Sequence, residues 1–496
     1  MTLRPSSAPP GCPAHTQASH RADALGMPPT AAASPPLMHP AGSWPPGPPS
    51  GLTGWGLLRQ MSRDLIGTAS VWQAQYGDVV HLRIWPEHQV LVMDPALVRD
   101  LLVTHHDALI RWERGVQVFA QLHGRSVLVS EGAAWRAKRQ ALQPAFAPKP
   151  VQAFVPTIAE TARRALADWP AASASWPIEQ AFTSLAMAVI LRNLFSGDMD
   201  ELGDEARAAE QAVRTVTELA DAEFYWPASW PAAMPWKRRK REALATLNRL
   251  IDRQLQARLA MAVAARPDDL LSRLLALHDG DAAAWPLRAV RDECMTAFLA
   301  GHETVASSLT WWAWCMAAHP QAQAAAAEAV RQQLQGRLPG VDDLPALGAL
   351  TQTLHEAMRQ YPAAPVLMTR RCTRPITLGP WQLPARTLFM VPLQLMQRDP
   401  RWFAEPELFR PERFGPQAPA LPRGAWMPFG AGPRVCLGQH LAMAEMTVVA
   451  AMVLQRVVLS VPEGQGAPTP VLHVTLRPNT PLNLRLSPAI HGVNTH

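Results

Sequence analysis

One cysteine lies in a glycine-rich loop and is the side chain best placed to do chemistry. Cys436 stands in the stretch 429–438, which reads Phe-Gly-Ala-Gly-Pro-Arg-Val-Cys-Leu-Gly. Backbone N–H groups and the start of a following helix stabilise a thiolate, the metal-binding form of cysteine. Glycines let the backbone approach a flat ligand closely, and Arg434 could pair with an anionic group on it. The alternative is a buried structural cysteine in a turn.

An acid beside an alcohol is the second candidate for chemistry. A long apolar segment, 287–318, predicts a helix and contains Ala300, Gly301, His302, Glu303 and Thr304. Glycine costs roughly 1 kcal/mol against alanine inside a helix, and a threonine hydroxyl competes for backbone partners. We therefore expect a helix that is loosened at this point. The alternative is a kinked helix with a solvent-facing glutamate.

Two weaker patterns pair residues one helical turn apart. Glu356 and Arg359 are spaced as in an ordinary surface salt bridge. Arg413 follows them in the stretch Pro-Glu-Arg-Phe. Trp135 and Arg139 share one helix face and could both donate to a carboxylate, although an amphipathic surface helix would look the same.

Together, these motifs resemble the cytochrome P-450 family, over roughly residues 45–490. The cysteine stretch is similar to the family's haem-binding signature, and the acid–alcohol stretch to the oxygen-binding part of its central helix. The resemblance implies a mainly α fold with a small β-rich subdomain. It also implies haem b (iron protoporphyrin IX) and a haem-thiolate monooxygenase of the soluble bacterial type, which inserts one oxygen atom of O2 into its substrate.

The resemblance assigns a role to each residue. Cys436 would be the axial iron ligand, while Thr304 and Glu303 would handle oxygen and protons. A structural triad behind the haem would consist of Glu356, Arg359 and Arg413. The other haem contacts would be Trp135, Arg139, Arg370, Arg434, Phe429, Gly432, Gly438, Ala300 and Gly301. Arg371 rivals Arg370 for a haem propionate, and Gln397 stands where the family commonly has histidine.

The composition describes a globular protein with a large core. The chain has 496 residues, of which 48% are apolar and 17% charged. Its five cysteines are scattered, which excludes a disulfide framework or zinc site and fits a reducing compartment. No basic run is interleaved with aromatic residues, so we expect no nucleic-acid partner. The densest basic run, 237–241, predicts a solvated helix start, and contact with a membrane surface is the alternative.

The pattern of apolar residues predicts mostly helices. Strands are expected at Val79–Ile84 and Gln89–Met93, a small sheet at 364–395 and strand-like pieces such as Val471–Leu476. Helical patterns run through 153–168, 177–195, 202–221, 238–263, 287–318, 320–335, 345–360 and 439–456.

The expected domain organisation is simple. A Pro- and Ala-rich tail at 1–44 precedes one domain at 45–490 and a short tail at 491–496. No apolar stretch is long enough to span a membrane, so we expect a cytoplasmic protein without a transmembrane anchor. The segment after Cys436 leaves no room for a fused reductase, so electrons would come from a separate ferredoxin or flavodoxin with its reductase.

The resemblance also implies an apolar substrate pocket. Candidate wall residues are Trp112, Phe119, Phe298, Val366 and Leu367, which favour a fatty acid, terpenoid or steroid. His123 and Arg114 could bind a substrate carboxylate or could lie at the surface. Two alternative functions are a peroxide-using peroxygenase, which would not need the acid–alcohol pair, and a non-catalytic haem-binding sensor.

Overall fold

The computed structural model describes residues 44–197, 203–225 and 234–489. The chain divides into two units, Met1–Met38 and His39–His496, and every described residue belongs to the second. The expected tails at 1–44 and 491–496 lie outside the described residues, except for Trp44.

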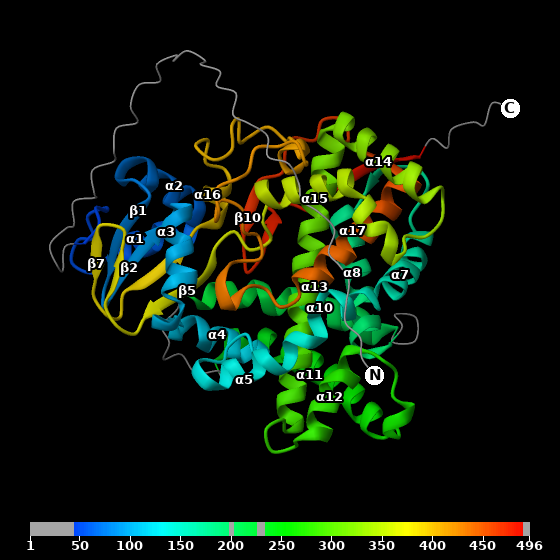
Figure 1. Cartoon of the computed structure of the whole chain (residues 1–496), viewed down its shortest axis with the longest axis horizontal. Coiled ribbons are helices and arrows are strands. Elements are labelled where there is room, and N and C mark those ends of the chain that lie inside the picture. Colours follow the sequence, from blue (N-terminus) through cyan, green and yellow to red (C-terminus); the bar gives the residue numbers. More distant parts are fainter. Residues whose placement is uncertain (1–43, 198–202, 226–233, 490–496) are drawn as a thin grey trace, which may run out of the picture. The chain divides into compact units, whose positions relative to one another are not determined.

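Helices dominate the described residues (Figure 1). Between Val155 and Arg456, apart from the short α16, they are α7 (Val155–Ala167), α8 (Ile178–Phe195), α10 (Asp204–Glu223), α11 (Arg238–Leu259), α12 (Leu270–Gly280), α13 (Leu287–Ala318), α14 (Pro320–Leu334), α15 (Gly348–Gln360) and α17 (Gln439–Arg456). The others are α1 (Trp55–Arg63), α2 (Leu65–Tyr76), α3 (Pro95–Arg99), α4 (Glu113–His123), α5 (Gly132–Leu142), α6 (Pro148–Gln152) and α16 (Leu393–Gln397).

Helix α13 is the centre of the helical part (Figure 1). It is buried on nearly all sides, as expected of a helix that other helices surround. It packs against α8, α12, α15 and α17. The side chains of α13 are therefore held in position by the helices packed around it.

The strands form one larger sheet and three small ones. The larger sheet has the order β1 (Val79–Ile84), β2 (Glu87–Val92), β8 (Leu388–Val391), β5 (Leu367–Cys372) and β3 (Leu109–Arg111). Strands β2 and β8 run parallel, and the other neighbours are antiparallel. The smaller sheets pair β4 (Ser173–Trp176), β12 (Leu484–Pro488) and β9 (Val457–Ser460); β10 (Pro470–Leu472) and β11 (Leu476–Pro478); and β6 (Ile376–Leu378) and β7 (Trp381–Leu383).

Most predicted elements are confirmed, and two expectations are wrong. The run Val471–Leu476 is a hairpin of β10 and β11 rather than one strand. The basic run at 237–241 does begin a helix, but it is not solvated throughout. Lys240 is buried, and its Nζ donates to Glu223 Oε1 at 2.8 Å.

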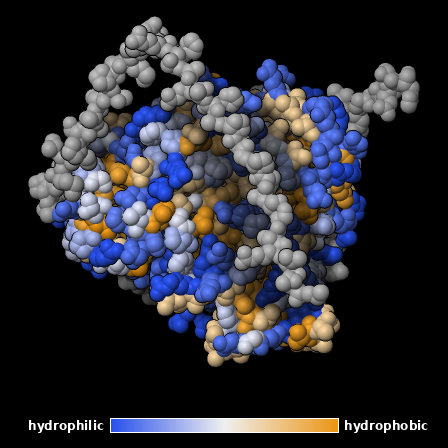
Figure 2. Space-filling view, in the orientation of Figure 1, coloured by the Kyte–Doolittle hydropathy of each residue, from blue (hydrophilic) through white to orange (hydrophobic). Residues whose placement is uncertain are grey.

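The residues that the structure describes contain no helix that could span a membrane. None of their helices is long and apolar enough to cross a bilayer. Figure 2 shows mostly hydrophilic side chains on one face, with small groups of apolar side chains between them.

Candidate active site

The loop before α17 holds Cys436 in a fixed backbone geometry. The Cys436 N–H donates to the Phe429 carbonyl at 2.9 Å, which closes the loop on itself. Gly432 has a φ of 73°, and a Cβ there would lie 2.1 Å from the carbonyl oxygen of Leu102. Only glycine fits this position, because both the left-handed backbone and the close approach exclude a side chain.

The Cys436 side chain combines solvent access with close surroundings. It is accessible to solvent, although protein surrounds it on nearly every side. Burial raises the pKa of its thiol, whereas the Gly438 N–H bonded to it and the positive charge of Arg139 act in the opposite direction. A free thiol here is therefore mostly protonated, and a bound metal ion would displace the proton.

Three of the expected cofactor-binding side chains gather beside this loop. Arg139 Nη1 donates to the Val435 carbonyl at 2.9 Å. The Arg434 guanidinium lies 4.1 Å from the centre of the Trp135 ring, in cation–π geometry. The structure thus brings Trp135 and Arg139, one turn apart on α5, against the loop that carries Cys436.

Arg370 and Arg371 differ sharply in their surroundings. Arg371 is buried, and its guanidinium pairs with Glu87 and Glu113, each at 2.7 Å. Arg370 makes one short bond to the Met368 carbonyl and remains half-exposed. Burial lowers the pKa of Arg370 to about 10, while the nearby charge of Glu131 opposes this shift. The remaining N–H groups of Arg370 favour it over Arg371 as the group that meets an anion.

The acid–alcohol pair lies on α13, which runs unbroken from Leu287 to Ala318. Thr304 Oγ1 donates to the Ala300 carbonyl at 2.6 Å. Ala300 is exposed and Thr304 half-exposed, although most of α13 is buried. The expected loosening of the helix is wrong, because α13 is unbroken at Gly301. Close packing against α8 explains the glycine instead: a Cβ there would lie 3.0 Å from Ile190 Cδ1.

Glu303 is buried rather than solvent-facing. Its Oε1 accepts hydrogen bonds from Thr475 Oγ1 and Arg477 Nη2, both at 2.7 Å. These partners lie on the β10–β11 hairpin, more than a third of the chain away in sequence. The glutamate next to Thr304 is therefore held as one half of an ion pair.

The triad residues form a buried network under the loop. Arg359 donates to both oxygens of Glu356, at 2.7 and 2.8 Å, and Arg413 Nε lies 3.3 Å from Glu356 Oε1. Gln397 extends the network, since its Nε2 donates to the Arg359 carbonyl and its Oε1 accepts from the Met427 N–H. It thus joins α15 to the segment that leads into the Cys436 loop.

Several functional contacts were not predicted from the sequence. Glu131, Gln397 and Arg477 each contact a predicted site residue that is distant in sequence. The two polar pocket candidates, His123 and Arg114, are not free surface side chains. His123 is buried, which lowers its pKa to about 4, and Arg114 donates to the Glu223 carbonyl.

The candidate pocket walls divide into two groups. Phe298 is fully buried in the packing between helices, so it does not contribute to a pocket. The remaining wall candidates are half-buried: Trp112, Phe119, Val366 and Leu367.

The chain belongs to the cytochrome P450 family, which it matches over residues 45–485. It is 33% identical to the cyclooctat-9-en-7-ol 5-monooxygenase of Streptomyces melanosporofaciens, over 77% of this chain and 82% of that protein. It is 31% identical to the cyclooctatin synthase of the same organism, over 83% and 88% of the two chains. It is also 26% identical to the chloroplastic carotene epsilon-monooxygenase of Arabidopsis thaliana, over 87% and 82%. The chain is thus an oxidoreductase of the monooxygenase type.

Members of this family hold haem b through a cysteine thiolate, and the residues around Cys436 fit that group. Nothing lies within 4 Å of the point where a Cβ on Gly438 would stand, so the loop leaves open space two residues after the cysteine. The guanidinium groups nearby suit the two propionates of haem b. Among the described residues, no three or more His, Cys, Asp or Glu side chains form a metal cluster.

Proposed function

We propose that this enzyme holds haem b through Cys436 and oxidises a hydrophobic small molecule of the terpenoid class. The observation that carries the proposal is the meeting of Trp135, Arg139 and Arg434 at the loop of Cys436, a cysteine that remains accessible to solvent. Thiolate-ligated haem supplies the chemistry that cleaves the O–O bond of O2.

The chain's own residues would position the reactants and move protons. Arg139, Arg370 and Arg434 would bind the propionates and fix the orientation of the cofactor. Thr304 would hold a proton at its Oγ1, beside the exposed surface of Ala300. Glu303 would return that proton after exchanging one of its present partners, since its Oε1 is now bonded to both Thr475 and Arg477.

The terpenoid class is supported by the candidate pocket and by the relatives. Phe119 and Phe224 form an aromatic pair with ring centres 5.5 Å apart, and both are half-buried. Val366 and Leu367 add further half-buried apolar surface. The names of two relatives refer to cyclooctat-9-en-7-ol and cyclooctatin, and another to carotene. Cytoplasmic location and a single domain over 45–490 are parts of the same proposal.

The first test is the difference spectrum of the reduced, carbon monoxide-bound protein. We expect the long-wavelength Soret band typical of thiolate-ligated haem, because the thiolate donates electron density to the iron. Cys436→Ser should lose that band. Cys294→Ala, at a buried cysteine of the α13 core, should keep it. A band typical of histidine ligation in the natural protein would contradict the proposal.

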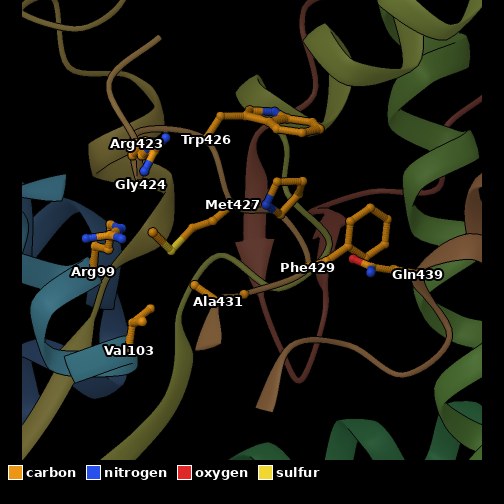
Figure 3. A pocket seen from close by; sticks show the side chains of 11 residues that line it. Arg99, Val103, Arg423, Gly424, Trp426, Met427, Phe429, Ala431 and Gln439 are labelled. Carbon is orange, nitrogen blue, oxygen red and sulfur yellow. The ribbon is translucent and has the colours of Figure 1, made fainter. Parts of the chain in front are cut away.

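The electron donor is proposed to be a separate protein with an acidic surface, such as a ferredoxin or flavodoxin. A pocket of about 280 Å³ lies beside the cysteine loop and is lined by Phe429 and Ala431 of that loop and by Met427 just before it (Figure 3). Arg99 and Arg423 border it on one side. Both are exposed, and neither has an ion-pair partner among the described residues. Such unpaired guanidinium groups favour an acidic partner.

Substitution of these arginines tests the docking site. Arg99→Gln and Arg423→Gln should each raise the KM for a reduced ferredoxin, with kcat nearly unchanged at saturation, because removing a charge at an interface mainly slows association. The effect should shrink at high salt. Arg59→Gln, at an exposed position on α1, is the matched control. Equal KM values for all the variants would exclude this pocket as the docking site.

A further inference from the structure

Glu131 lies directly before α5 and contacts two arginines from other parts of the chain. Its Oε1 accepts from the backbone N–H of Arg111 at 3.2 Å and from Arg111 Nη1 at 3.3 Å. Its Oε2 accepts from Arg434 Nη2. The Ser130 carbonyl accepts from Arg434 Nη1 at 3.1 Å, so two successive residues hold one guanidinium.

A third arginine belongs to the same group. Strands β3 and β5 pair so that Arg111 stands opposite Arg370. Burial raises the pKa of Glu131 to about 7, and the charge of Arg370 acts in the opposite direction. The contacts with Arg111 and Arg434 favour the ionised form of Glu131. One carboxylate thus faces three guanidinium groups, and the excess positive charge leaves room for two more carboxylates.

Arg434 is the residue that Glu131 and a haem propionate would both need. A guanidinium has five N–H donors, so it can serve two carboxylates at once. Two carboxylates that share one guanidinium nevertheless repel each other, and this repulsion is stronger in a partly buried site than in water. Glu131 would therefore orient Arg434 and also weaken the binding of a propionate by Arg434.

We propose that Glu131 is a positioning residue that limits how tightly the chain holds haem b, by sharing Arg434 with a propionate. The inference rests on the proposed function, in which Arg434 binds that propionate. It predicts that the charge of Glu131, and not its hydrogen-bonding shape, sets the rate of haem release.

The test measures haem transfer from the full haem-loaded chain to excess apomyoglobin, followed by the Soret change. Glu131→Gln keeps the shape but removes the charge. It should slow the release by roughly tenfold, the factor for about 1.4 kcal/mol of lost repulsion. Glu131→Asp keeps the charge and should release haem at the natural rate. Glu113→Gln, which removes a neighbouring acid that pairs with Arg371 instead, should also leave the rate unchanged.

Other outcomes would overturn the inference. If Glu131→Gln releases haem at the natural rate or faster, Glu131 only supports the local structure. The same conclusion follows if Glu131→Gln fails to load haem while Glu131→Asp loads it. Arg434→Gln separates the two proposals, because it should accelerate release wherever Arg434 binds a propionate. If it does not, the propionate assignment fails; if it does while Glu131→Gln releases no more slowly, only the role of Glu131 fails.

Discussion

At the scale of single residues, Glu303 depends on a partner from a distant hairpin. Arg477 is the cation nearest to this buried carboxylate, and its other terminal nitrogen, Nη1, lies 4.0 Å from Glu218 on α10. Thr475 adds one neutral hydrogen bond. The position of the acid beside Thr304 is therefore set by a hairpin that also contacts α10.

We expect Arg477→Gln to destabilise the protein by about 3 kcal/mol, because it leaves the buried carboxylate of Glu303 without its cation. The measurement is the free energy of unfolding in denaturant. The double variant Glu303→Gln with Arg477→Gln should lose much less than the sum of the two single variants, since neither charge then remains unpaired.

Glu218→Gln is the matched control for Arg477. Glu218 is 44% exposed and 4.0 Å away, so its loss should change the free energy of unfolding by less than about 1 kcal/mol. Additive effects of Glu303→Gln and Arg477→Gln would contradict the proposed dependence of Glu303 on Arg477.

Site residues that stand close together in the sequence could be predicted from their spacing. Contacts between residues that are distant in the sequence could not. Cys436 and Arg434 stand in one short motif, so their neighbourhood could be predicted from ten residues. Glu131 and Arg434 are separated by 303 positions, and no local pattern connects them. Arg371 could be separated from Arg370 only once the pairing of Arg371 with Glu87 and Glu113 was known.

At the scale of elements, boundaries were predictable where turn residues mark them. Helix α13 begins directly after Pro286 and ends at Ala318, two residues before Pro320, so its predicted limits are confirmed. The run Val471–Leu476 was interpreted as strand-like, because the hairpin turn of β10 and β11 at 473–475 contains no glycine, proline or asparagine to mark it. Gly301 was misread as a loosening element, since the packing of α8 cannot be seen in the sequence of α13.

Gln397, at the end of α16, positions the segment before the cysteine loop through hydrogen bonds to other elements. It follows β8 at the end of α16 and bonds to the Met358 and Arg359 carbonyls of α15 and to the Met427 N–H. Arg359 in turn donates to the Gln397 carbonyl at 2.8 Å. The helix of the Glu356–Arg359 pair and the start of the cysteine loop are therefore joined through one buried amide.

At the scale of the whole molecule, the composition predicted a large apolar core but not what is buried in it. Helix α17 runs from the cysteine loop into that core. Glu445 lies on it, is buried, and has no partner for its Oε1 among the residues that the structure describes. Burial raises its pKa from the ordinary value of 4.5 to about 8. The folded protein thus keeps a proton that the unfolded chain releases.

This difference makes stability depend on pH in a definite direction. Below pH 4.5 both states bind the proton, and Glu445 has no effect. Stability falls as the pH rises towards 8, because only the unfolded chain releases the proton there; above 8 the loss is complete. The full shift corresponds to a loss of about 5 kcal/mol as an upper estimate.

We expect Glu445→Gln to remove this loss, since a neutral amide of the same shape has no proton to release. The free energy of unfolding of the variant, minus that of the natural protein, should increase by several kcal/mol between pH 5 and pH 9. Taking the difference cancels the titration of every other group. Glu463→Gln, at an exposed position, should give a difference that does not vary with pH. Parallel curves for Glu445→Gln and the natural protein would mean that Glu445 finds a partner in solution, and that the core of α17 holds a satisfied carboxylate.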